Sequence, residues 1–232
     1  MESKVCITIT ANSSNDLLTK LAELEAEHSF FELRLDGLKD LSTSVIEAIV
    51  QAKKSKVILT LRTKSQGGLF EGSQDEYRLL VEECFKQKSE YVDVELSFLQ
   101  NLNLFENSNL DQTRAIVSHH DFLDTPDDAE LNAIVESMKQ LAPEAILKIA
   151  CMTRDMSDVL RLVDLQKAQE PNKSIMIAMG QSGQLLRMIG PSIGAFTSFV
   201  SAELSPAAPG QLYYKDMLRI FNAMESTKNG RK

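Results

Sequence analysis

Short apolar runs alternate with longer amphipathic stretches along the 232-residue chain. The short runs have the length and composition of strands, and the longer stretches repeat apolar residues every three or four positions, as a helix with one buried face does. Leu131, Ile134, Val135 and Met138, for example, mark a single helical face. The predicted strands are Val5–Thr10, Phe30–Leu35, Val57–Arg62, Tyr91–Leu96, Ala115–His120, Ala145–Ala150, Ser174–Ala178 and Ala195–Val200. The predicted helices include Asp16–His28, Ser42–Lys53, Asp75–Lys88, Asp128–Leu141 and Ser157–Gln169, with Asp75 and Asp128 as N-caps.

Eight strands that alternate with helices over this length fit an α/β fold of the (β/α)8 TIM barrel class. A doubly wound parallel sheet is the competing arrangement. No Gly-rich turn follows the first predicted strand, so the signature of a dinucleotide-binding sheet is missing. Because no linker, internal repeat or low-complexity segment interrupts the pattern, we expect one barrel domain over residues 1–232.

Polar side chains share one face of several predicted strands, whereas the opposite face is apolar. The apolar faces suit packing against helices, so the polar faces should point into the barrel, near the strand ends where barrel enzymes build their sites. Because buried charges are costly unless they are paired, a structural ion-pair network is the alternative to an active site. The residues concerned are Glu32 and Arg34, Thr60 and Arg62, and Asp93 and Glu95.

Lys148 lies in an apolar predicted strand and has no carboxylate close to it in the sequence. Strand alternation puts Lys148 on one face with Ile146 and Ala150. Burial disfavours the charged form of a lysine, so an interior Lys148 is a candidate nucleophilic amine. The alternative is a lysine on an edge strand whose ammonium group reaches water.

Alternation also separates two adjacent histidines. His120 shares a face with Ser118 at the end of its strand, and His119 lies on the opposite face. We therefore expect His120 in the barrel interior, and His119 packed or partly exposed outside. A histidine that faces a lysine on the next strand is a candidate for proton transfer near neutral pH.

The overall charge and composition limit the possible partners. A net charge of −8, with basic residues clustered only at the end of the chain, argues against a nucleic-acid partner. No apolar stretch approaches the roughly 18 residues of a membrane helix, and no signal peptide is recognisable. Three scattered cysteines form neither a disulfide framework nor a metal-binding set. We expect a cytoplasmic protein that binds no membrane.

Arg34, Arg62 and Arg187 would form a cationic mouth on this acidic protein. A guanidinium fork suits a small carboxylate, and glycine-containing loops after the third, seventh and eighth strands would let backbone approach such a ligand. A metal is not expected, because the carboxylates and histidines lack ligand spacing and Lys148 with the arginines would repel a cation.

Several short motifs form a specific combination along nearly the whole chain. They are Glu32-Leu33-Arg34-Leu35-Asp36, Thr60-Leu61-Arg62, Gly67-Gly68, Ser118-His119-His120-Asp121-Phe122 with Thr125-Pro126, Leu147-Lys148-Ile149-Ala150, Arg187, and Ala208-Pro209-Gly210-Gln211. In combination they resemble the type I 3-dehydroquinate dehydratases of the shikimate pathway. They look closest to the dehydratase half of fused dehydratase–shikimate dehydrogenase proteins.

The resemblance implies a barrel of the class I aldolase type, commonly a homodimer, that needs no metal or organic cofactor and dehydrates 3-dehydroquinate to 3-dehydroshikimate. It implies that Lys148 forms a Schiff base with the C3 ketone. His120 would remove the C2 proton and then protonate the departing C1 hydroxyl, a syn loss of water. Arg187 carries over as the clamp on the substrate carboxylate. Other substrate-binding or supporting roles carry over to Glu32, Arg34, Arg62, Gln211, Glu95 and, as a weaker match, Thr8.

Two positions depart from the family pattern. Gln66 stands where a glutamate usually orients the histidine, so we hypothesise that the pKa of His120 is lower than in a glutamate-supported homologue. Ala207 stands where a serine usually touches the substrate, and the loss of one such hydrogen bond costs on the order of 0.5–1.5 kcal/mol.

Two other functions remain open on the residues alone. One is a Schiff-base aldolase or transaldolase-like lyase on the same barrel, which would need a phosphate site after the seventh and eighth strands. The other is a catalytically silent barrel kept as a binding module, which only the departures at Gln66 and Ala207 suggest. Turnover of 3-dehydroquinate distinguishes all three.

Overall fold

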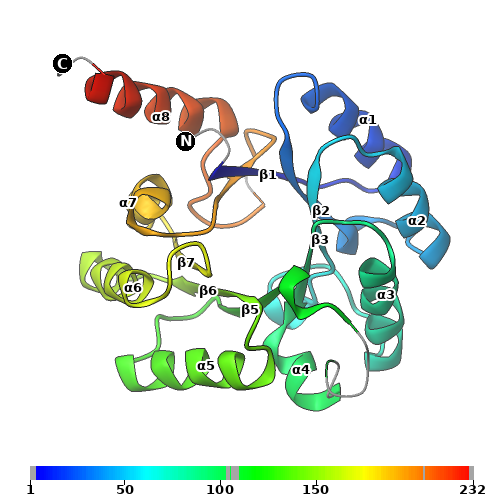
Figure 1. Cartoon of the computed structure of the whole chain (residues 1–232), viewed down its shortest axis with the longest axis horizontal. Helices are drawn as coiled ribbons and strands as arrows, with labels where there is room; N and C mark the ends of the chain where they lie inside the picture. The colour runs from blue at the N-terminus through cyan, green and yellow to red at the C-terminus, as the bar shows by residue number, and fades with distance from the viewer. Residues whose placement is uncertain (1–3, 103–104, 106–109, 206, 230–232) are drawn as a thin grey trace.

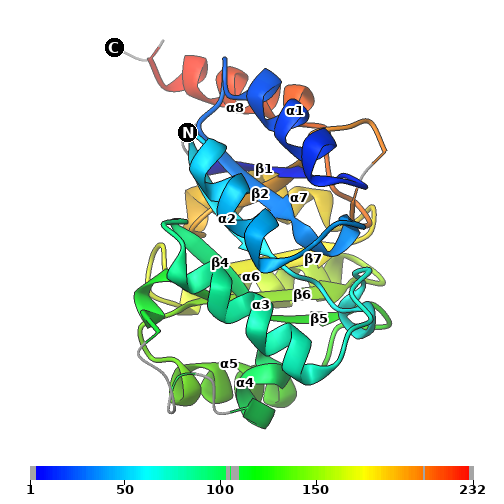
Figure 2. The same cartoon turned by 90° about the vertical axis from the view of Figure 1, so that its right-hand side faces the viewer.

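Eight parallel strands form a nearly closed barrel, and the helices lie around its outside (Figures 1 and 2). The structure is a computed structural model that describes residues 4–102, 105, 110–205 and 207–229. The strands are β1 (Val5–Ile9), β2 (Phe30–Arg34), β3 (Lys56–Thr60), β4 (Tyr91–Glu95), β5 (Ala115–Asp121), β6 (Ile146–Met152), β7 (Ser174–Met179) and β8 (Ser198–Ser201). The predicted (β/α)8 TIM barrel is confirmed.

The order of strands in the sheet is β7-β6-β5-β4-β3-β2-β1-β8. Since β1 pairs with both β2 and β8, the sheet curls round on itself, and β7 and β8 are its two ends. Near the start of these two strands, the backbone N–H of Phe196 donates to the carbonyl oxygen of Ser174 at 2.9 Å.

The helices alternate with the strands. They are α1 (Ser14–Leu24), α2 (Thr43–Ala52), α3 (Gln74–Lys86), α4 (Leu96–Leu102), α5 (Asp128–Leu141), α6 (Met156–Ala168), α7 (Gln184–Ile189) and α8 (Tyr214–Asn229), with short 3₁₀ turns η2 (Leu35–Gly37), η3 (Lys64–Gln66), η4 (Gln112–Arg114) and η5 (Gly190–Ile193). Within the described part of the chain, no helix combines the length and the apolar character needed to cross a membrane.

The predicted N-caps of α3 and α5 are wrong by one or two residues. Ser73 caps α3 in a capping box with Glu76, and the Asp127 side chain accepts from the backbone N–H of Glu130 at the start of α5. Asp75 and Asp128 instead lie in the first turns, where a carboxylate also favours the helix dipole. The eighth strand is also shorter than predicted, because it starts at Ser198 rather than Ala195.

Two apolar clusters divide the core. The larger lies between the strands and the surrounding helices. The smaller fills the barrel interior and includes Cys6, Phe30, Ile58, Ile116, Ile146, Ile175, Ile177, Met179 and Phe199. Most of its members lie near the strand starts, whereas the interior residues that follow on β2, β3, β4 and β5 are polar and buried or half-buried. The barrel interior is therefore apolar near the strand starts and polar at the carboxyl ends of the strands.

Candidate active site

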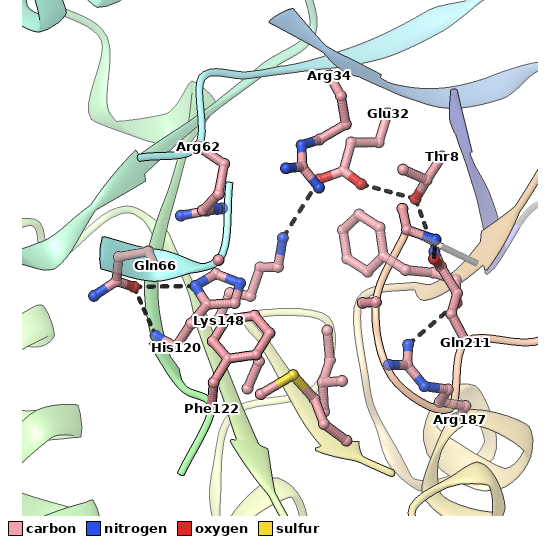
Figure 3. Close-up of a pocket in the computed structure, with 17 residues that line it drawn as sticks. Thr8, Glu32, Arg34, Arg62, Gln66, His120, Phe122, Lys148, Arg187 and Gln211 are labelled. Carbon is pink, nitrogen blue, oxygen red and sulfur yellow. Dashed lines mark hydrogen bonds and ion pairs between the residues drawn. The ribbon is translucent and has the colours of Figure 1, made fainter. Parts of the chain in front are cut away.

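A pocket opens at the carboxyl ends of the strands (Figure 3). The structure brings together at this pocket every predicted site residue except Glu95. They are Thr8, Glu32, Arg34, Arg62, Gln66, His120, Lys148, Arg187, Ala207 and Gln211. Sequence reasoning did not assign a role to the other lining residues, among them Phe122, Ile177, Met179, Phe199 and Ala208.

Lys148 is a buried ion-paired residue in the middle of β6, with 4% of its surface exposed. Its Nζ lies 2.9 Å from Asp93 Oδ2 and 3.5 Å from Glu32 Oε1, and 4.3 Å from the centre of the Phe199 ring. The edge-strand alternative for Lys148 is therefore excluded. The segment around Lys148 contains no such partner, but β4 and β2 supply two carboxylates from across the barrel.

Asp93 joins Lys148 to Arg62. Asp93 Oδ1 lies 2.7 Å from Arg62 Nη2 and accepts a 2.6 Å hydrogen bond from Ser118 Oγ, while Arg62 Nη1 donates to the same Ser118 oxygen at 2.8 Å. Burial alone would raise the pKa of Asp93, but the charges of Arg62 and Lys148 outweigh it and lower the pKa to about 2. Asp93 is therefore a fixed anion below the pocket.

Glu95 lies beneath the pocket and supports Arg62. Its Oε1 lies 3.3 Å from Arg62 Nη1 and accepts from the backbone N–H of Thr63 at 2.8 Å, while its Oε2 accepts from Thr63 Oγ1 at 2.7 Å. Burial raises the pKa of Glu95 despite the nearby guanidinium. The residue thus ties Arg62 to the start of the loop after β3 and does not line the pocket.

A chain of hydrogen bonds connects the loop after β8 to Glu32. Gln211 Oε1 accepts from the backbone N–H of Ala207 at 3.1 Å, and its Nε2 donates to Thr8 Oγ1 at 3.0 Å. The Thr8 hydroxyl donates to Glu32 Oε2 at 2.8 Å, and Thr60 donates to Glu32 Oε1 at 3.0 Å. Strand register explains the middle of this chain, because Thr8 on β1 lies beside Glu32 on β2.

Gln66 holds the imidazole of His120. Gln66 Oε1 accepts from the backbone N–H of His120 at 2.8 Å and lies 3.2 Å from its Nδ1. Since the backbone N–H requires an acceptor, the amide oxygen faces the ring, so Nδ1 carries the hydrogen and Nε2 keeps its lone pair. Burial, followed by the positive charges of Arg62 and Lys148, lowers the pKa of His120 well below its usual range. His120 is therefore a neutral imidazole, and the hypothesis that its pKa is lower than in a glutamate-supported homologue stays a prediction.

Phe122 lies between the imidazole of His120 and Gly67. Its ring is stacked at 6.3 Å and 15° to the imidazole. Gly67, in the left-handed conformation with φ of 77°, leaves the space that Phe122 fills, because a Cβ there would lie 2.2 Å from the Phe122 Cζ. His119 lies on the opposite strand face and is half-buried, as predicted.

The three predicted arginines of the cationic mouth differ in their partners. Arg34 forms a fork with Asp36, both contacts at 2.8 Å, and Arg62 is paired as described. Arg187 is 5% exposed, and its Nη1 and Nη2 make only 3.4 Å contacts with the carbonyl oxygens of Phe199 and Pro209. Its Nε is buried without a partner among the described residues, which offer the guanidinium no ion pair. Burial lowers the pKa of Arg187 to about 10. Within the part of the chain that the structure describes, Arg187 is therefore the arginine of the mouth without an ion pair.

The loops after β7 and β8 meet beside Arg187. Gly180 N–H donates to the Pro209 carbonyl oxygen at 3.2 Å, the same oxygen that Arg187 contacts. Gly210 has φ of 73°, and a Cβ there would lie 2.1 Å from the Gly180 oxygen. Glycine at this position therefore permits the close approach of the two loops. No group of three or more potential metal-binding side chains occurs in the described ranges.

Asp93 is the main residue that sequence reasoning left out of the site. Strand alternation placed it inside the barrel, but its contact with Lys148 depends on how β4 and β6 lie relative to each other across the interior. Phe199 and Met179 were missed because the sequence gives apolar interior residues no feature that separates pocket wall from core. The sequence places Asp36 in a motif but indicates no role for its side chain. In the structure, Asp36 binds Arg34 and accepts from the backbone N–H of Leu69 at 3.0 Å.

Comparison with known proteins assigns the family. The model of the family described as type I 3-dehydroquinase matches residues 5–228. A 3-dehydroquinate dehydratase of Methanococcus maripaludis strain C7 is 32% identical over 218 residues, which cover 93% of this chain and 97% of the relative. One of Coxiella burnetii strain CbuK_Q154 is 26% identical, with 92% and 90% covered.

Solved structures share the fold. The 3-dehydroquinate dehydratase of Geobacillus kaustophilus matches with a TM-score of 0.80 at 21% identity, over 96% of this chain and 91% of that one. The type I enzyme of Clostridium difficile, described with covalently modified comenic acid, matches with a TM-score of 0.81 at 24% identity, over 97% and 92%. With a family model that spans nearly the whole sequence, this chain belongs to the type I 3-dehydroquinase family.

Proposed function

We propose that this protein dehydrates 3-dehydroquinate to 3-dehydroshikimate through a Schiff base on Lys148. One arrangement carries the proposal. A buried lysine, a neutral histidine base and a buried arginine that has no counterion among the described residues line the same pocket (Figure 3). These are the groups needed to capture a ketone, move a proton and hold a carboxylate. The substrate and its place in the shikimate pathway follow from the family.

Arg187 binds the carboxylate of the substrate in this proposal. A buried guanidinium without a counterion is costly, so a carboxylate that enters the pocket gains a charge-assisted fork and relieves that cost. A ring compound anchored there has its far side directed toward the lysine, which approaches from the opposite part of the pocket in Figure 3.

His120 then takes a proton from Lys148, the resulting amine attacks the C3 ketone, and loss of water with return of that proton gives a cationic imine. The imine draws electrons from C2, so His120 Nε2 can remove the C2 proton, and the resulting enamine expels the C1 hydroxyl as water when the same imidazole returns a proton. Hydrolysis of the imine releases the product and restores the amine. The imine is the electron sink, so these steps need no metal or organic cofactor.

The remaining lining residues contact or orient the substrate in this proposal. Glu32, Arg34, Arg62, Thr8 and Gln211 offer hydrogen bonds to the ring hydroxyls, and the Ala207 backbone lies on the same side of the pocket. Gln66 sets the tautomer of His120, and Glu95 supports Arg62. The neutral Gln66 keeps the imidazole a base but gives its protonated form no full counter-charge.

Turnover of 3-dehydroquinate, followed as the enone absorbance of the product, tests the proposed activity. We expect Lys148→Met and His120→Asn each to lose at least about a thousandfold in kcat, since each removes a group that reacts. Folded wild-type protein without turnover would contradict the assignment of substrate. A lyase or aldolase alternative would then be tested with other keto acids.

We also propose that residues 1–232 act as one catalytic domain, as a homodimer, in the cytoplasm. These properties come from the family resemblance alone, as does the likeness to the dehydratase half of fused proteins. Light scattering of the purified chain tests the dimer, with a monomer mass as the contradicting result. Messenger RNA that continues in frame into a dehydrogenase would support the fused origin.

A further inference from the structure

Asp93 is the carboxylate nearest to the reacting nitrogen, and it has no assigned part in the chemistry. Its side chain is 1% exposed on β4. One oxygen, Oδ2, points at Lys148 Nζ at 2.9 Å. The other, Oδ1, is held by Arg62 and Ser118. Arg62 and Ser118 therefore hold Asp93 in an orientation that directs Oδ2 at the lysine nitrogen.

Glu32, the second carboxylate beside Lys148, has different neighbours. Its oxygens accept from the hydroxyls of Thr8 and Thr60, and it lies 3.5 Å from the lysine nitrogen. Asp93 is bonded by a guanidinium as well as by a hydroxyl, and its pKa is lowered to about 2. Asp93 is thus held ionised by the neighbouring guanidinium of Arg62.

The charge on the lysine nitrogen explains what a permanent anion does there. An ammonium group and a ketone give an iminium ion and water, R–NH₃⁺ + O=C → R–NH⁺=C + H₂O. The N–C bonds form, the C–O bonds break, and both hydrogens of the water come from the nitrogen. The nitrogen is cationic before and after, so one counterion serves both states. A cation in this buried interior is costly without a counterion.

We propose that Asp93 is a catalytic residue, the fixed counterion that keeps the Lys148 nitrogen cationic both at rest and as the imine. Imine formation then takes up no net proton. This inference rests on the proposed Schiff base, which it deepens. The centre of the uncharged Phe199 ring lies 4.3 Å from the nitrogen and adds a cation–π contact.

Replacement of Asp93 by asparagine changes the proton balance. Without Asp93, Glu32 at 3.5 Å is the carboxylate left beside the buried nitrogen, and we expect this nitrogen to rest as the neutral amine. Imine formation then consumes a proton, R–NH₂ + O=C + H⁺ → R–NH⁺=C + H₂O. By linkage, the population of the cationic imine falls about tenfold for each unit of rising pH. In the wild-type protein it does not depend on pH.

The other groups that face the lysine do not imitate this signature between about pH 6 and about pH 8. The carboxylates of Asp93 and Glu95 raise the pKa of Arg62 above its ordinary value, although burial opposes them. Burial raises the pKa of the Cys6 thiol well above its ordinary value. Burial and the nearby cations hold the pKa of His120 well below its ordinary value. Glu32 and Arg187 are present in both proteins, so any effect of theirs is common to both.

The test is the initial rate at which cyanoborohydride fixes 3-dehydroquinate on Lys148, measured by peptide mass spectrometry across this pH range. We expect a flat profile for wild type and, for Asp93→Asn, a rate that falls about tenfold per pH unit. Glu95→Gln is the matched control, because it removes a buried carboxylate from Arg62 on the same strand without touching Lys148. We expect its profile to be flat. Thermal unfolding of each variant verifies the fold.

Parallel profiles for wild type and Asp93→Asn would overturn the inference, as would a sloped profile for Glu95→Gln. If wild type fixes no 3-dehydroquinate, the proposed substrate has failed, and acetaldehyde replaces it as the carbonyl compound. The proton balance with Lys148 is the same for acetaldehyde. The same contrast in slopes would then support Asp93 as the counterion independently of the dehydratase, and its absence would reject it.

Discussion

Gln66 and His120 are joined through a single oxygen, since Gln66 Oε1 lies 2.8 Å from the backbone nitrogen of His120 and 3.2 Å from its Nδ1. An amide oxygen at this place fixes the neutral tautomer without offering a negative charge. The imidazole is surrounded by the cations Arg62, Lys148 and Arg34, which with burial lower its pKa. Burial and the cations therefore keep the imidazole neutral, and Gln66 fixes which nitrogen carries the hydrogen.

Gln66→Glu should raise the pKa of His120, because a carboxylate stabilises the imidazolium. A base loses activity as the pH falls through its pKa, so the acidic limb of the kcat/KM profile should move to higher pH in the variant. Gln51→Glu on the exposed face of α2 adds the same charge far from the pocket and should leave the limb in place. An unmoved limb in Gln66→Glu would contradict this account of His120.

Gly67→Ala should disturb His120 through Phe122. The new Cβ would lie 2.2 Å from the Phe122 ring, at a residue with φ of 77°. We expect a loss of about 1–3 kcal/mol in the free energy of unfolding, together with a lower kcat. Gly190→Ala, whose nearest atom would lie at 3.5 Å, should cost less. Urea unfolding and turnover measure the two effects, and equal losses in both variants would count against the packing role of Gly67.

Arg187→Met should separate binding from stability. The methionine fills similar space and removes a buried charge that lacks a counterion, so the free energy of unfolding should stay the same or rise. KM should rise by roughly 30-fold or more, as expected when one partner of a buried charge pair is lost. Arg34→Met is the contrast, because it leaves the buried Asp36 unpaired and should destabilise the fold. A large loss of stability in Arg187→Met would show that the guanidinium is structural.

Thr8→Val should break the hydrogen-bond chain from Gln211 to Glu32. The substitution keeps the shape but leaves Gln211 Nε2 and one Glu32 oxygen without their partner, at a cost of about 1–3 kcal/mol. Activity should fall as well, because Glu32 contacts Lys148. Thr197→Val removes another buried hydroxyl, which bonds the Lys4 carbonyl far from the pocket, and should affect stability alone. Activity in Thr8→Val equal to that of Thr197→Val would contradict the role of the chain.

The barrel and the inward residues could be predicted because they depend on local periodicity. Alternation along each strand selects Glu32, Lys148 and His120 for the interior whatever the neighbouring strands do. The caps of α3 and α5 were wrong because two capping residues lie close together at each helix start, Ser73 with Asp75 and Asp127 with Asp128. The backbone turn decides which side chain accepts.

The partners of the charged residues could not be predicted from the sequence. Lys148 has no carboxylate near it along the chain, and its pair with Asp93 arises between strands that lie apart in the sheet order. The same applies to Arg187. Arg34 pairs with Asp36, and Arg62 pairs with Asp93, whereas Arg187 has no ion pair among the described residues. The residues beside Arg187 in the sequence do not reveal this difference. Such facts depend on strand register and loop closure.

Trapping of the imine tests the central claim most directly. The protein is incubated with 3-dehydroquinate, reduced with borohydride, and digested for peptide mass spectrometry. The account predicts one stable adduct on Lys148, and none in Lys148→Met. Folded protein that turns over the substrate but leaves Lys148 unmodified would contradict the Schiff-base mechanism.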